Sequence, residues 1–205
     1  MDKKPDMTTK EKILIATLEL ATEKGLGNVS LSQIAKKVGI KKPSLYNHFS
    51  SKDALILSLY EYLRKKARYK VASGEIDYGE MVKGKTAYEV LSQSVHSYRT
   101  MNQDSDMGSF YKFIMSERSI HKEAAGIMVA ETEKMILTTK QLFYAMQVQN
   151  VMCFENIDMA AFTFAMTVHS IMDYMGDQKM AGVDATAEQM LDEFLKDFCR
   201  MYEKK

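Results

Sequence analysis

The chain has 205 residues, of which 46% are hydrophobic, a net charge of +1, and only ten glycines and two prolines. The length allows a sizeable core, and the scarcity of turn-forming residues argues against an all-β fold. Because most of the common residues favour helices and no apolar stretch is long enough to span a bilayer, we expect an all-α, cytoplasmic protein with no membrane segment.

Two helices are predicted before Gly39. One runs from Thr8 or Thr9 to Lys24 and ends at Gly25, since glycine readily adopts the positive φ of a helix end. The next begins at Ser30 and Gln33, which have the spacing of a capping box. Gly39 ends that helix after two turns.

A third helix is predicted to open at Lys42-Pro43, since proline is tolerated in a first turn, and to end near residues 49–50. Leu45 and Phe49 lie one turn apart and are expected to point inward. A fourth helix is expected to start with a capping pair, Ser50 and Asp53, and to continue to about residue 68.

The remainder of the chain differs in composition. Residues 71–84 contain three glycines and no clear period, which predicts a loop. Further helices are expected near 85–103, 107–117, 121–149, 157–176 and 186–203, about nine in total. Fifteen of the seventeen methionines lie after residue 80, whereas the front is built from Leu, Ile and Val. We therefore predict a domain of residues 1–52 followed by a larger helical domain of residues 53–205.

The two short helices separated by Gly39 form a candidate helix-turn-helix, in which the second helix of the pair enters a DNA major groove. Charge fits this function: residues 1–52 contain ten Lys, no Arg and five acidic residues, a net of +5, against −4 for the rest. A basic front suits polyanion binding, although five excess lysines could equally serve only to solvate a small domain.

Several residues at fixed spacing extend this pattern between Ile13 and Leu57: Ala16, Leu20, Gly25, Ser30, Ile34, Ala35, Gly39, Leu45, Tyr46, His48, Phe49, Lys52, Asp53 and Leu55. This stretch resembles the N-terminal domain of the tetracycline-repressor (TetR) family of bacterial regulators. It departs from the family pattern at Lys41-Lys42-Pro43, where Ser-Lys-Gly or Ser-Lys-Ala is more frequent, and at Ala21, where Phe is common.

The resemblance implies DNA-contact roles. Ser30 corresponds to a hydroxyl that caps the second helix and meets a phosphate. Base-reading and groove-packing positions are occupied by Lys42, Pro43, Ser44 and Asn47. Phosphate or DNA-backbone contacts are implied for Tyr46 and His48, and a phosphate contact is implied for Lys52. With Lys41, the predicted DNA-binding residues are Ser30, Lys41, Lys42, Pro43, Ser44, Tyr46, Asn47, His48 and Lys52. The alternative is a polar helix face that contacts only solvent.

The family fold also implies a helical effector-binding domain that dimerises through its last two helices. An apolar stripe in the last predicted helix suits such an interface and consists of Leu191, Phe194, Leu195, Phe198 and Met201. A symmetric dimer would match a palindromic site, with recognition helices roughly 34–36 Å apart. An ordinary core helix within one chain would produce the same stripe.

A methionine-rich cavity for a partly apolar small-molecule effector is predicted in the larger domain, because methionine adapts to varied ligands. The candidate residues are Tyr88, His96, Arg99, Tyr111, Met128, Met135, Met166 and His169. These methionines could instead simply fill the core, and the histidines could be satisfied core side chains.

Other functions lack sequence support. No nucleotide-binding loop, nucleophile elbow or zinc-protease motif is found, so we predict no catalytic residues, no metal site and no cofactor. Cys153 and Cys199 are expected to be buried, inert thiols. We therefore predict a DNA-binding transcriptional regulator, a repressor released from a palindromic operator by an effector. The alternative is a helical protein that keeps this fold but binds a protein partner.

Overall fold

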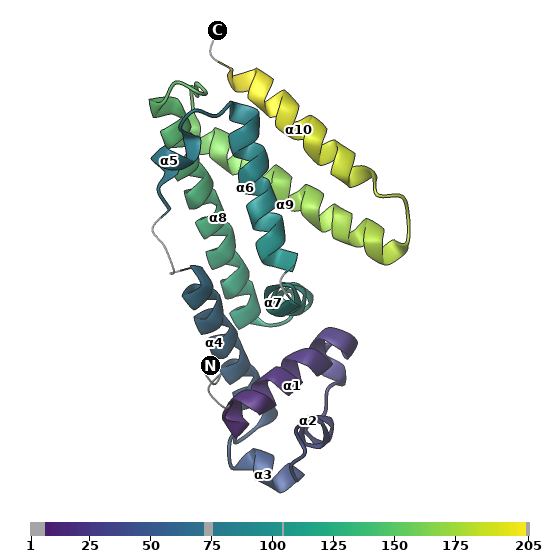
Figure 1. Cartoon of the computed structure of the whole chain (residues 1–205). Coiled ribbons are helices and arrows are strands. Elements are labelled where there is room, and N and C mark those ends of the chain that lie inside the picture. Colours follow the sequence, from purple (N-terminus) through teal and green to yellow (C-terminus); the bar gives the residue numbers. More distant parts are fainter. Residues whose placement is uncertain (1–6, 72–75, 104, 204–205) are drawn as a thin grey trace, which may run out of the picture. The chain divides into compact units, whose positions relative to one another are not determined.

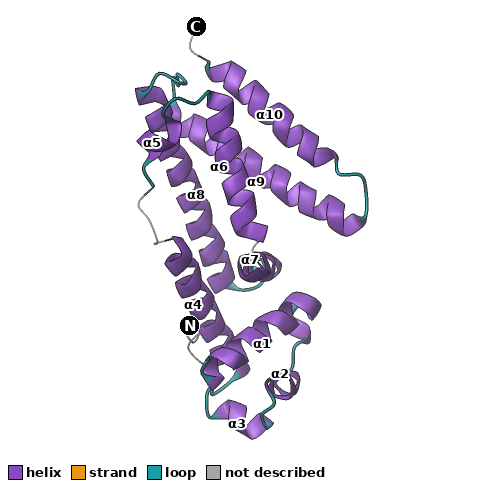
Figure 2. Cartoon of the chain, in the orientation of Figure 1, coloured by secondary structure: helices purple, strands orange, loops and turns teal. Residues whose placement is uncertain are grey.

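The computed structural model describes residues 7–71, 76–103 and 105–203, which contain helices and no strand (Figures 1 and 2). The all-α prediction is confirmed. In chain order the elements are α1 (Thr9–Lys24), η1 (Leu26–Asn28), α2 (Leu31–Val38), α3 (Lys42–Tyr46), α4 (Lys52–Val71), α5 (Tyr78–Val82), α6 (Ala87–Gln103), α7 (Ser105–Glu117), α8 (Lys122–Val148), α9 (Ile157–Ala181) and α10 (Thr186–Tyr202).

The described residues form ten α-helices, one more than the nine expected. The additional helix is α5, within the segment 71–84 for which the sequence predicts a loop; residues 72–75 of that segment lie outside the described residues. Asp77 caps α5 by accepting a hydrogen bond from the Glu80 backbone N–H at 3.0 Å. A helix this short contains too few residues for an apolar period to be recognised.

The chain divides into two compact units, which are described separately. The N-terminal unit comprises Met1–Gly74 and Asn102–Val129, and the C-terminal unit comprises Glu75–Met101 and Ala130–Lys205. The N-terminal unit is therefore larger than residues 1–52, since it includes α4, α7 and the start of α8. A functional domain boundary at residue 52 stays a prediction.

The core of the N-terminal unit forms around α1, which packs against α2, α4 and α7. Ile13, Ile34, Leu45, Leu55 and Leu59 are completely buried there. Side chains from α7 complete the same cluster: Phe110, Phe113 and Ile114. The sequence alone did not indicate that α7 belongs to this core.

Local signals place most of the helix ends. The capping box predicted at Ser30 and Gln33 is confirmed, with both reciprocal contacts present. The cap of α4 differs from the prediction: Ser51, not Ser50, accepts from the Ala54 backbone N–H at 3.0 Å, because the helix begins at Lys52. The third helix is also shorter than predicted and ends at Tyr46.

The C-terminal unit is built on an aromatic cluster centred on Phe143 of α8. Its ring stacks on Phe154 with centroids 4.7 Å apart and contacts Phe164 and Phe198 at 5.4 and 5.6 Å. Because Phe164 lies in α9 and Phe198 in α10, this cluster joins three helices. α9 and α10 also pack directly against each other.

Candidate nucleic-acid interface

The turn between α2 and α3 has the geometry of a helix-turn-helix. Gly39 ends α2 in the left-handed conformation, φ 79° and ψ 27°, and donates its backbone N–H to Ala35 and Lys36. α3 packs against α2 through the fully buried Leu45, and Phe49 follows at 3% exposure. The predicted inward direction of Leu45 and Phe49 is confirmed. Both side chains therefore anchor α3 to the N-terminal unit.

The opposite face of α3 and its flanks is polar and accessible. Lys41, Lys42, Pro43, Tyr46, Asn47 and His48 are exposed, and Ser44 is half-buried. The ammonium groups can donate to phosphate oxygens, and the amide, imidazole and hydroxyl groups can donate to base edges. The structure thus brings seven of the nine predicted DNA-binding residues together on one short segment.

Ser30, the eighth, is exposed at the start of α2. Its hydroxyl accepts from the Gln33 backbone N–H at 3.2 Å and lies 3.1 Å from the Gln33 side-chain oxygen. This capping box fixes the first turn of α2, whose remaining backbone N–H groups can face a phosphate. In this geometry the backbone, more than the hydroxyl itself, is available to an anion.

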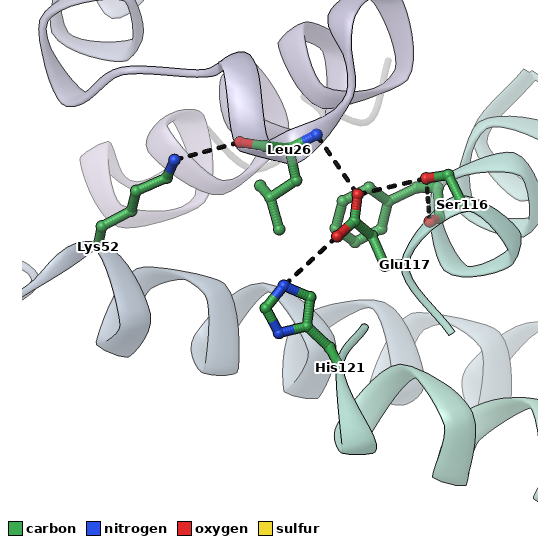
Figure 3. Close-up of polar contacts among 6 residues, drawn as sticks. Leu26, Lys52, Ser116, Glu117 and His121 are labelled. Carbon is green, nitrogen blue, oxygen red and sulfur yellow. Dashed lines mark hydrogen bonds and ion pairs between the residues drawn. The ribbon is translucent and has the colours of Figure 1, made fainter. Parts of the chain in front are cut away.

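Lys52, the ninth, is half-buried, and its ammonium donates to the Leu26 carbonyl oxygen at 3.1 Å (Figure 3). An ammonium has three donors, so this contact still allows one to phosphate. No local sequence pattern indicates the Leu26 contact, since 26 residues separate the two partners. Lys52 therefore ties the start of α4 to η1.

A further basic residue, not predicted from the sequence, lies near this surface. The Lys10 ammonium lies 5.5 Å from the centre of the Phe49 ring. The first turn of α1 is thus next to the segment that follows α3. The only sequence signal was the general excess of lysine in residues 1–52, which does not single out a position.

The predicted effector-pocket residues are divided between the two units. Tyr111 and Met128 belong to the N-terminal unit; the other six belong to the C-terminal unit. On α6, Tyr88 donates to Asp192, and Arg99 pairs with Glu188 at 3.1 Å. These two side chains therefore tie α6 to α10. His96 is exposed, His169 lies 3.7 Å from Asp173, and Met135 and Met166 are half-buried.

A cleft of about 440 Å³ lies elsewhere in the C-terminal unit, between the start of α6 and the end of α10. It is lined by Lys85, Thr86, Ala87, Tyr88, Val151, Cys199, Arg200 and Glu203. Tyr88 is the one predicted pocket residue in this lining. Burial, with the nearby Glu203 charge, raises the pKa of the Cys199 thiol to about 11. Cys153 is exposed, so the prediction that both thiols are buried is wrong for Cys153.

Most side chains of the stripe predicted to form the dimer interface are buried within their own chain. Leu191, Leu195 and Phe198 are only 3–4% exposed and belong to the core of the C-terminal unit. Phe194 is half-buried, and Met201 is 73% exposed. Three of the five side chains are therefore occupied by α10's packing inside the unit.

Neither a helix able to cross a membrane nor a group of three or more metal-ligating side chains is found among the residues that the structure describes.

Residues 13–59 match the family model of bacterial regulatory proteins, tetR family. Over 86 residues the chain is 35% identical to YerO of Bacillus subtilis (strain 168), an uncharacterized HTH-type transcriptional regulator; the match covers 42% of this chain and 28% of YerO. Over 46 residues it is 48% identical to IcaR, the HTH-type negative transcriptional regulator of the biofilm operon icaADBC in Staphylococcus aureus (strain Newman), covering 22% and 25%. The matches thus span about a quarter of these relatives.

The likeness of folds extends over nearly the whole chain. A putative transcriptional regulator from Saccharomonospora viridis, solved in complex with choline, matches with a TM-score of 0.65 and 17% identity, over 93% of this chain and 95% of that one. At this identity the similarity shows the fold alone.

Proposed function

We propose that the chain is a member of the tetR family of bacterial regulatory proteins and acts as a sequence-specific DNA-binding transcriptional regulator, because residues 13–59 match the family model. The observation that carries the proposal is the α2–Gly39–α3 geometry. Buried Leu45 and Phe49 hold a short helix whose opposite face presents exposed lysine, tyrosine, asparagine and histidine side chains. That arrangement matches what a major-groove reader requires.

We further propose that the protein is a cytoplasmic repressor, acting as a homodimer on a palindromic operator. IcaR is a negative regulator, and its matched segment supports the same sign here. Dimerisation is supported by apolar side chains that α10 exposes rather than buries: Met190 is 47% and Met201 73% exposed. Together with half-buried Phe194 they share one face, since the spacings are close to whole helical turns.

We also propose that a small, partly apolar molecule is the effector that releases the protein from its operator. The Saccharomonospora viridis regulator was solved with choline, which supports a small-molecule site in a protein of this fold. The 440 Å³ cleft beside Tyr88 has a size suited to such a ligand. Effector binding would displace helices of the larger domain and change the spacing of the two reading heads.

The test is in-vitro selection of random duplexes by the purified chain at about 150 mM salt, followed by titration of the selected duplex against a scrambled one. We expect a palindrome that binds at least about 10³-fold more tightly than the scramble. Lys42→Glu should abolish that preference, and Lys179→Glu, which reverses an exposed charge in α9, should preserve it.

Equal binding of selected and scrambled duplexes, unchanged by Lys42→Glu, would contradict the regulator and favour the alternative of a protein-binding module. The exposed basic face of α3 supports the DNA reader over that alternative, because a phosphate backbone is the partner that such a face fits.

A further inference from the structure

The backbone of Leu26 is held from two sides by charged side chains (Figure 3). Its carbonyl oxygen accepts from the Lys52 ammonium at 3.1 Å, and its N–H donates to Glu117 Oε1 at 3.4 Å. Lys52 begins α4 and Glu117 ends α7, so two helices far apart in sequence meet at one residue of η1. All three residues belong to the N-terminal unit.

Glu117 is unusual because it is an acidic side chain that is only 5% exposed. Burying a carboxylate is costly unless it is paired or hydrogen-bonded. Ser116 lies 3.4 Å away, but its single proton is committed to the Phe113 carbonyl at 2.8 Å. Among the described residues, the groups left to the carboxylate are the Leu26 N–H and His121, whose Nε2 lies 3.4 Å from Oε2.

Leu26 in turn controls how the chain enters the helix-turn-helix. Its carbonyl also accepts from the Val29 backbone N–H at 3.1 Å, and the next residue, Ser30, caps α2. Because Leu26 is 2% exposed, its side chain is fixed in the core as well. Moving Leu26 would therefore move the start of α2.

We propose that Glu117 and Lys52 are positioning residues for DNA reading: by holding Leu26 they set the placement of α2, and through it α3, on the end of α7. The inference rests on the proposed DNA-binding function. Glu117 itself need not touch DNA.

The sign of the effect separates this role from simple electrostatics. Removing an acidic group near a DNA-binding surface should strengthen binding to a polyanion. A positioning role requires the reverse, because the reading helix loses its placement. We expect Glu117→Ala to weaken binding to the selected duplex about tenfold, with a smaller change for the scrambled duplex. Glu117→Gln keeps an oxygen that can accept from the Leu26 N–H and should restore most of the affinity.

Glu123 provides the matched control, since it is exposed in the first turn of α8 and Glu123→Ala removes the same charge. The second measurement is backbone amide hydrogen exchange without DNA. We expect Glu117→Ala to accelerate exchange at Leu26 and Val29 at least tenfold, with Glu117→Gln and Glu123→Ala close to wild type. Titrations are made well below each variant's unfolding midpoint.

Unchanged exchange at Leu26 in Glu117→Ala would overturn the inference whether or not the wild-type chain selects an operator, so its failure is distinct from failure of the proposed function. Faster exchange with undiminished operator affinity would also overturn it. For Lys52 the measurement is a double-mutant cycle with Lys52→Met. If the losses of DNA-binding free energy in Glu117→Ala and Lys52→Met simply add in the double variant, Lys52 contacts phosphate alone. If the two residues are coupled through Leu26, the double variant loses less binding free energy than the sum of the two single losses.

Discussion

At the scale of single residues, Tyr60 of α4 shows a buried polar group without a partner. It is 4% exposed, its ring centroid lies 5.7 Å from that of Phe113, and its hydroxyl has no hydrogen-bond partner among the described residues. Burial, with the charges of Glu117 and Glu123, raises the pKa of Tyr60, so the phenol is neutral at any physiological pH.

Removing the Tyr60 hydroxyl should not destabilise the fold. We expect Tyr60→Phe to leave the free energy of unfolding unchanged or to raise it by up to about 1 kcal/mol, because an unsatisfied buried hydroxyl costs desolvation energy. Urea unfolding measures this, and Tyr46→Phe, at an exposed position, is the control with no expected change. A clear loss of stability in Tyr60→Phe would mean that the hydroxyl is bonded to a buried water.

The two thiols should react very differently. Cys153 is exposed, whereas the pKa of Cys199 is raised to about 11 by burial and by Glu203. Because the thiolate is the nucleophile, at pH 8 only on the order of a thousandth of Cys199 is reactive. We expect iodoacetamide to alkylate Cys153 first, and the Cys199 rate to rise with pH until about 11. In Cys153→Ser, mass spectrometry measures the alkylation of Cys199 alone. Rapid alkylation of Cys199 at pH 8 would contradict the prediction.

At the scale of elements, the start of α10 depends on a side chain from α9. No side chain of the N-cap residue Ala185 can cap the helix; instead Gln178, 4% exposed, accepts from the Ala187 backbone N–H at 3.1 Å and donates to the Thr186 hydroxyl at 2.8 Å. One buried amide thus fixes the α9–α10 hairpin.

We expect Gln178→Ala to lower the free energy of unfolding by about 1–3 kcal/mol, because it leaves the buried Ala187 N–H unsatisfied. Thermal or urea unfolding measures the loss. Gln189→Ala is the matched control: its exposed side chain donates to Glu193 of the same helix, and the effect of the substitution should stay within about 0.5 kcal/mol. Equal effects of the two substitutions would show that the interhelix cap contributes nothing.

At the scale of the whole molecule, reading a palindrome requires two copies of the chain. Since Leu191, Leu195 and Phe198 are buried within one copy, the proposed interface uses the face of α10 that carries Met190, Phe194 and Met201. We expect the wild-type chain to be a dimer in light scattering. Met190→Glu combined with Met201→Glu should raise the dimer dissociation constant at least tenfold, because each substitution would bury a charge in the proposed interface. Val148→Glu, at an exposed position in α8, should leave the dimer intact. A dimer indifferent to both α10 charges would place the interface elsewhere.

The sequence by itself determined what depends on neighbouring residues. Gly39 ends α2, Ser30 and Gln33 form a capping box, and Leu45 and Phe49 point inward, because each follows from contacts within a few residues. Only the tertiary structure decided which distant groups meet. An apolar stripe such as Leu191–Phe198 predicts that the side chains are buried, but not which surface buries them. Here most of the stripe is buried by other residues of the same chain. Glu117, Lys52 and Leu26 come together only because α4 and α7 pack on α1, and no local pattern encodes a contact over 91 residues.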